Sequence, residues 1–180
     1  MAYLGQVNYL LASLSLAGQV FIVLALVMLI FFRRRQNKML VWFRAKALVL
    51  SFIVALVATL SSLYYSEIAG FVPCELCWFQ RIFMYPQVIL LGLAYLKKDF
   101  KIINYSLPLI LIGALFSIYH NYIYYTAQPS NGFCSITAPC TQVYIVGFNY
   151  ISIPLLAIIS FLMIGLLLLF AKTGKTETVV

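Results

Sequence analysis

Residues 10–35 read LLASLSLAGQVFIVLALVMLIFFRRR, an apolar run that ends in three arginines. Roughly 20 apolar residues are enough for a helix to cross the hydrocarbon core of a bilayer. A secretory signal peptide carries its positive charge before its apolar core, whereas the first charged residue here is Arg33. The stretch therefore predicts a membrane span with the N-terminal tail outside and the arginines on the cytoplasmic side.

The rest of the chain is equally apolar. Of its 180 residues, 64% are hydrophobic and only 9% are charged, and the mean hydropathy is +1.03. A soluble domain of this size could not bury so much apolar surface, and long runs without alternation argue against an outer-membrane barrel. The predicted fold is an all-α membrane protein with spans at about Leu10–Phe32, Ala47–Ser66, Trp78–Leu96, Ile102–Tyr125 and Tyr150–Ala171.

The basic residues indicate the orientation of these spans. With the N-terminal tail outside, all but one of the 12 lysines and arginines fall on the cytoplasmic side, as the positive-inside rule requires. Only Arg81 falls on the outer side. Topology and lipid head groups thus account for the net charge of +8, and nucleic acid is not an expected partner. We expect a multi-pass protein of the cell (inner or plasma) membrane with a cytoplasmic C-terminus.

The chain has 4 cysteines, all of them in the predicted outer loops. Cys74 and Cys77 lie in the short loop that leads into the third span, and Cys134 and Cys140 lie in the longest outer loop. Thiols that face an oxidising compartment form disulfides. Two cysteines three positions apart can be a structural disulfide, half of a zinc site or a redox pair.

The redox pair is the favoured interpretation. A disulfide between residues so close in sequence closes a small loop and constrains the unfolded chain little. The five residues between Cys134 and Cys140 do not fit the short paired spacings of a four-cysteine zinc site, so no metal is expected. A helix that begins at the first pair would also lower the pKa values of its thiols.

Two further polar residues lie in the spans next to this pair. Arg81 follows Cys77 by four residues, so a helix that includes both cysteines would carry all three side chains on one face. Arginines near helix ends often snorkel to lipid head groups, yet ionisable residues within spans are usually functional. His120 lies at a similar depth in the fourth span and is either a hydrogen-bonded core residue or a donor in a cofactor pocket.

The run CELCWFQRI, Cys74 to Ile82, is followed by Met84-Tyr85-Pro86 and resembles the DsbB family, most closely its BdbC-like branch. Gly147-Phe148 and the later run 151–154 resemble the same branch. The resemblance implies a DsbB-type four-helix transmembrane bundle over residues 47–171. This chain would add an N-terminal transmembrane helix with a basic cytoplasmic loop over residues 1–46, and a cytoplasmic tail over 172–180.

The resemblance also implies a function. The family reoxidises a thioredoxin-fold, DsbA-like thiol oxidase and passes the electrons to a membrane quinone, either ubiquinone or menaquinone. Cys74 and Cys77 would form the pair nearest the quinone, with Cys77 as the thiolate that meets its ring. Cys134 would accept the attack of the partner, and Cys140 would pass the electrons towards Cys74. The quinone-binding residues would be Arg81 and His120.

Two other functions fit the same cysteines. A quinone reductase similar to vitamin K epoxide reductase could be fed by a thioredoxin-like donor, because the direction of electron flow depends on the reduction potentials of the partners. The chain could also be a non-enzymatic membrane scaffold or transporter with structural disulfides. Such a protein would show no quinone reduction.

Overall fold

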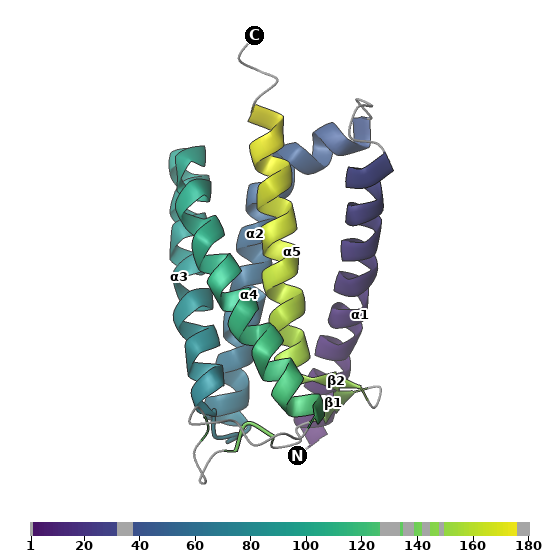
Figure 1. Cartoon of the computed structure of the whole chain (residues 1–180), viewed down its shortest axis with the longest axis vertical. Helices are drawn as coiled ribbons and strands as arrows, with labels where there is room; N and C mark the ends of the chain where they lie inside the picture. Colours follow the sequence, from purple (N-terminus) through teal and green to yellow (C-terminus); the bar gives the residue numbers. More distant parts are fainter. Residues whose placement is uncertain are drawn as a thin grey trace.

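A computed structural model of the chain describes residues 2–31, 38–126, 134, 139–141, 145–147 and 150–175. In this part of the chain, five long helices run along the molecule and two short strands close one end (Figure 1). The helices are α1 (Ala2–Phe31), α2 (Lys38–Leu63), α3 (Glu75–Lys97), α4 (Ile103–Thr126) and α5 (Ile153–Lys175). Each is long and apolar enough to cross a membrane, which confirms the predicted all-α membrane fold.

The lipid environment explains why the spans are helical. In a bilayer no water is available to the backbone, so each span must satisfy its N–H and C=O groups internally, as a helix does. Pro86 in α3 and Pro108 in α4 lie inside helices, which membrane helices tolerate when neighbours re-satisfy the freed backbone groups. The end of α2 widens into a π-helical turn, Tyr64–Ile68, and a short 3-10 turn, Phe100–Ile102, precedes α4.

The structure differs from the sequence predictions in several places. Residues 38–46, predicted as part of a basic loop, form the first turns of α2, because they lack glycine and proline and are rich in good helix formers. The third helix begins at Glu75 instead of Trp78. The strands β1 (Ile145–Gly147) and β2 (Ile151–Ser152) pair antiparallel, and they are too short to show an alternating pattern in the sequence.

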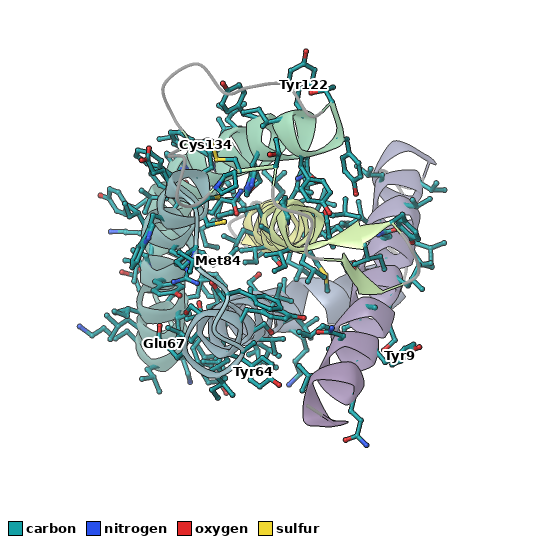
Figure 2. All side chains as sticks on the ribbon, turned by 90° about the horizontal axis from the view of Figure 1, so that it is seen from below. Tyr9, Tyr64, Glu67, Met84, Tyr122 and Cys134 are labelled. Carbon is teal, nitrogen blue, oxygen red and sulfur yellow. A yellow bond between two sulfur atoms is a disulfide. The ribbon has the colours of Figure 1, made fainter. Side chains whose placement is uncertain are left out.

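The four helices α2 to α5 form a bundle in which α2 and α4 each pack against both α3 and α5. Seen along the helices, α5 lies in the middle, with α4, α3, α2 and α1 around it (Figure 2). The side chains of α5 that are fully buried in the core are Phe161, Ile164, Leu167 and Leu168. Gly113 of α4 allows the close contact with Phe161, because a Cβ at this position would overlap the phenylalanine ring. Helix α1 packs on the outside of this bundle, mainly against α5 and β1.

The two ends of the bundle differ in chemistry. The beginnings of α1, α3 and α5 lie at the end that carries the strands, and the C-terminal end of α5 lies at the other end (Figure 1). The cysteine pair that precedes and opens α3 is therefore separated from the lysines at the far ends of the helices, which are Lys46, Lys97, Lys98, Lys101 and Lys172. The arginine run 33–35 and the last residues of the tail, 176–180, lie outside the described residues.

Candidate active site

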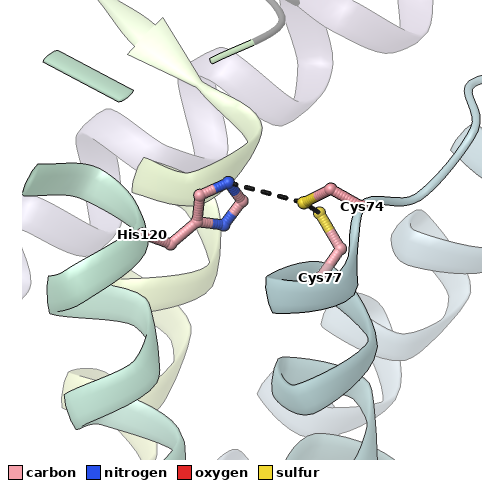
Figure 3. Close-up of side chains that lie close together, drawn as sticks. All are labelled: Cys74, Cys77 and His120. Atoms are coloured by element: carbon pink, nitrogen blue, oxygen red, sulfur yellow. Dashed lines mark hydrogen bonds between the residues drawn. The ribbon is translucent and has the colours of Figure 1, made fainter. Parts of the chain in front are cut away.

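The first cysteine pair lies at the N-terminus of α3. Cys74 is the N-cap residue, with an extended backbone (φ −72, ψ 170), and its carbonyl accepts a hydrogen bond from the Trp78 N–H at 3.1 Å. Cys77 lies in the first turn, so the helix brings its sulfur back towards Cys74. The two Sγ atoms are 2.9 Å apart and both residues are free thiols (Figure 3). This geometry lets the pair close into a disulfide with little movement of the backbone.

A histidine from α4 faces the pair. His120 is only 2% exposed, and its Nε2 lies 3.7 Å from Cys74 Sγ (Figure 3). Its other ring nitrogen, Nδ1, lies 3.1 Å from the side-chain nitrogen of Gln80. An amide nitrogen can only donate, so Nδ1 is the acceptor and Nε2 carries the ring proton, which faces the sulfur.

These contacts favour the thiolate form of Cys74. The hydrogen bond from the Cys77 thiol lowers the pKa of Cys74 most, burial opposes it, and His120 lowers it further, to about 4. The helix N-terminus acts in the same direction. In the reduced pair Cys74 therefore carries the negative charge and Cys77 keeps its proton. That Cys77 meets the quinone ring stays a prediction, since it concerns a later step.

The second pair packs against the first. Cys134 and Cys140 form a disulfide with a Cα–Cα distance of 5.7 Å. Cys140 is 3% exposed, whereas Cys134 is only partly buried. Both belong to one apolar cluster with Cys74, Leu76 and Ile123, and Figure 2 shows Cys134 at the end of the bundle where α3 and α4 meet. The fold thus brings the two predicted cysteine pairs together, although they are far apart in sequence.

Arg81 is anchored within the bundle. Its Nε donates to Ser62 Oγ at 3.0 Å and its Nη2 donates to the Ser62 carbonyl at 3.0 Å. Its guanidinium carbon lies 5.2 Å from the centre of the Trp78 ring, a distance at which a cation is attracted to the ring face. Arg81 therefore reaches across to α2, and its hydrogen bonds fix a positive charge about one turn of α3 beyond Cys77.

A cavity of about 610 Å³ joins these groups. Its volume is in the range of pockets that bind drug-sized ligands. The predicted site residues that line it are Cys74, Cys77, Arg81, His120 and Cys140. Most of its other lining residues are apolar, and they come from α1, α2, α3, α5 and the segments next to the two cysteine pairs. Cys134 is not among the lining residues.

The lining residues fit a lipid-soluble quinone. Apolar walls suit a ring and its tail, while the Arg81 guanidinium and the His120 Nε2–H are donors for a ring oxygen. The hydroxyl of Ser15, which is buried and has no hydrogen-bond partner among the described residues, belongs to the same wall. A buried hydroxyl without a partner is costly in an apolar setting, which is consistent with a polar group of a ligand nearby.

The same atoms also resemble part of a metal site. One ligand atom from each of Cys74, Cys77 and His120 lies within 4.8 Å of the others. Structural zinc sites use four protein ligands, and the described residues group only these three here.

Two contact residues were not anticipated from the sequence. Gln80 and Ser62 orient His120 and Arg81 respectively. A glutamine inside an apolar span, directly before the arginine, was a signal that pointed to Gln80. Ser62 gave no such signal, because serines near the ends of spans are common and usually bond to their own helix.

Comparison with known proteins identifies the family of the chain. The family described as "Disulfide bond formation protein DsbB" matches residues 44–171. The chain belongs to the DsbB family. It is 46% identical over 132 residues to "Disulfide bond formation protein C" of Bacillus subtilis (strain 168), a match that covers 71% of this chain and 93% of that protein. It is 50% identical over 124 residues to "Probable disulfide formation protein C 1" of Bacillus cereus (strain ATCC 10987 / NRS 248), covering 66% and 86%. No solved structure matches the chain.

Membership in the DsbB family makes this chain a membrane oxidoreductase of disulfide formation. The resemblance read from residues 74–86 is thereby confirmed. The family match begins at residue 44, so α1 lies outside it. The match to the Bacillus subtilis protein covers nearly all of that relative but leaves more than a quarter of this chain unmatched.

Proposed function

We propose that this DsbB-family protein oxidises the dithiol of a thioredoxin-fold partner and delivers the two electrons to a membrane quinone. This activity would support disulfide formation in exported proteins. The observation that carries the proposal is that the two cysteine pairs share one environment. Cys140 of the second pair and Cys74 of the first pack in one buried cluster and line one cavity together with Arg81 and His120.

The exposure of the second disulfide indicates where the partner attacks. Cys134 is the more accessible sulfur and Cys140 is buried, and disulfide exchange requires an accessible sulfur. A partner thiolate attacks Cys134 and forms a mixed disulfide, and Cys140 leaves as a thiolate. The second thiol of the partner then displaces Cys134. The partner leaves as a disulfide, and Cys134 and Cys140 hold its two electrons as a dithiol.

The next exchange moves these electrons to the first pair. The Cys140 thiolate attacks the oxidised pair at Cys74, and Cys77 leaves and takes up a proton. Cys134 then attacks Cys140, which closes the second disulfide again and releases Cys74 as a thiolate. The Cys77 thiol and His120 stabilise this leaving thiolate, and a leaving thiol of low pKa departs faster. The products are the thiols and the disulfide seen in the structure.

The residues around the cavity prepare the last transfer. A quinone in this cavity supplies an acceptor for two electrons and two protons. Arg81, fixed by Ser62, offers a positive charge at the cavity wall. His120 holds a proton on Nε2 beside the sulfurs and can hand it on. The first pair returns to a disulfide and is ready for the next cycle.

We place the cysteine end of the bundle on the extracytoplasmic side. The described lysines gather at the opposite end, together with the C-terminal end of α5, and basic residues favour the cytoplasmic side of a membrane protein. The cysteines would then meet exported proteins, and the C-terminus would be cytoplasmic.

The test uses purified protein, a reduced thioredoxin-fold partner and a quinone, mixed without oxygen. We expect quinol and oxidised partner to form in equal amounts. Cys77→Ser should abolish quinol formation, because the first pair can no longer close. Cys140→Ser should also abolish quinol formation, because Cys134 is then a free thiol and offers no disulfide for the partner to attack. Normal quinol formation by Cys77→Ser would refute the scheme, and absence of quinol with the unaltered protein would favour a scaffold.

A further inference from the structure

Helix α1 is held close to the bundle by a small residue. A Cβ added at Gly18 would lie 3.2 Å from Ile159 Cγ2 and 3.5 Å from Met163 Sδ of α5. Small residues at such positions let membrane helices approach one another closely. Near the cysteine end, the Tyr65 hydroxyl donates to Asn8 Oδ1 at 2.8 Å and links α1 to the end of α2.

This position makes α1 a wall of the cavity that contains the cysteines. The residues of α1 that line the cavity are Leu11, Leu14, Ser15, Gly18 and Phe21. The cavity is also lined by residues from α2 and α5. Since α1 lies outside the family match, this wall is a feature of the present chain and not of the matched domain.

The cavity has exposed lining residues at two places. Val72, 60% exposed, and Pro139 lie at the cysteine end, outside the spans. Leu14 of α1 at 51%, Ile53 of α2 at 47% and Val57 of α2 at 40% lie within membrane spans, so their exposed surfaces face lipid and mark a sideways opening between α1 and α2. Leu14 follows Asn8 by six residues and therefore lies about 9 Å further along its helix, at 1.5 Å per residue. The opening thus lies deeper in the membrane than the bond between Asn8 and Tyr65.

We infer that this opening is the entry path of the quinone and that the groove between α1 and α2 binds its isoprenoid tail. The inference rests on the proposed function and adds a tail site to it. An apolar tail stays in lipid because its transfer to water is unfavourable, so an acceptor must enter from the side. The opening is apolar, faces lipid and leads into the cavity that the cysteines and Arg81 line. A quinone whose ring is reduced while its tail remains in lipid requires these three properties.

The test narrows the opening without touching the cysteines. Leu14→Trp and Val57→Trp place a large ring at the two sides of the opening. Leu10→Trp and Leu60→Trp are matched controls, because these leucines are 58% and 56% exposed on the same helices and are absent from the cavity lining. Equilibrium dissociation constants are measured with the full-length protein for a quinone with a long isoprenoid tail and for the same ring without a tail.

We expect the two variants at the opening to weaken binding of the tailed quinone about tenfold, the scale on which an apolar pocket discriminates by size. Binding of the tail-less ring and binding by both controls should stay unchanged. A quinone with a photoreactive group on its tail should label peptides from α1 and α2. Unchanged binding of the tailed quinone by Leu14→Trp and Val57→Trp, or labelling confined to α3 and α4, would overturn the inference.

The result also separates this inference from the proposed function. If the tail variants behave like the controls while the unaltered protein reduces quinone, only the tail site is wrong. If the unaltered protein neither binds nor reduces either quinone, the proposed acceptor itself is wrong.

Discussion

Replacement of His120 by alanine should raise the pKa of Cys74. The imidazole Nε2 lies 3.7 Å from the sulfur and donates to its thiolate. A hydrogen bond to a charged group contributes roughly 1.5–3 kcal/mol, and one pKa unit corresponds to about 1.4 kcal/mol. Loss of this bond should therefore raise the pKa by roughly one to two units, from a starting value of about 4.

The sign of the pH effect follows from the thiolate. Cys74 reacts as a thiolate above its pKa, so its reactivity falls as the pH drops through that value. In His120→Ala this fall should occur at a higher pH than in the unaltered protein. The assay is the rate of iodoacetamide modification of Cys74 in the reduced protein as a function of pH, followed by mass spectrometry of the peptide that contains it.

Two further variants complete the comparison. Cys77→Ala should shift the midpoint more than His120→Ala, because the hydrogen bond from Cys77 is the largest cause of the low pKa of Cys74. Tyr122→Phe, an exposed position on the same helix, should leave it unchanged. Equal midpoints in His120→Ala and the unaltered protein, or a larger shift in His120→Ala than in Cys77→Ala, would refute this account of the thiolate.

Two substitutions test other parts of the structure. Arg81→Lys keeps the charge but loses the two hydrogen bonds to Ser62, so the KM for quinone should rise roughly threefold to tenfold. Exchange between the partner and the second disulfide should stay unaltered. An unchanged KM in a quinone titration would contradict this role of Arg81. Gly113→Ala should destabilise the protein by about 1–3 kcal/mol, because the new Cβ overlaps the Phe161 ring. Gly5→Ala is its control, with no atom within 4 Å of the added Cβ, and equal thermal stability of both variants in detergent would contradict the packing argument.

Much of the fold could be predicted from the sequence because a membrane helix is a local property. A run such as residues 10–32 must satisfy its backbone within itself once it is in lipid, so each span can be recognised without its neighbours. The cysteine pairs and Arg81 were also recognisable, because few residues of this kind occur in so apolar a chain. The resemblance carried by Cys74 to Ile82 then predicted the family that the comparisons confirm.

The arrangement of the site could not be predicted in this way, because it depends on contacts between helices. The sequence placed His120 at the depth of Arg81, but only packing of α4 on α3 sets its Nε2 against Cys74 and its Nδ1 against Gln80. The anchoring of Arg81 by Ser62 likewise joins two helices.

The sequence by itself therefore determined that the chain spans the membrane and which residues are the candidates for the redox chemistry. Only the tertiary structure decided that α1, predicted as an added helix of unknown role, forms a wall of the cavity beside them. The physical reason is that hydrophobicity along a chain records which segments enter lipid, whereas lipid and neighbouring helices are equally apolar. The partner of each helix face is then set by shape and hydrogen bonds between segments that are distant in sequence.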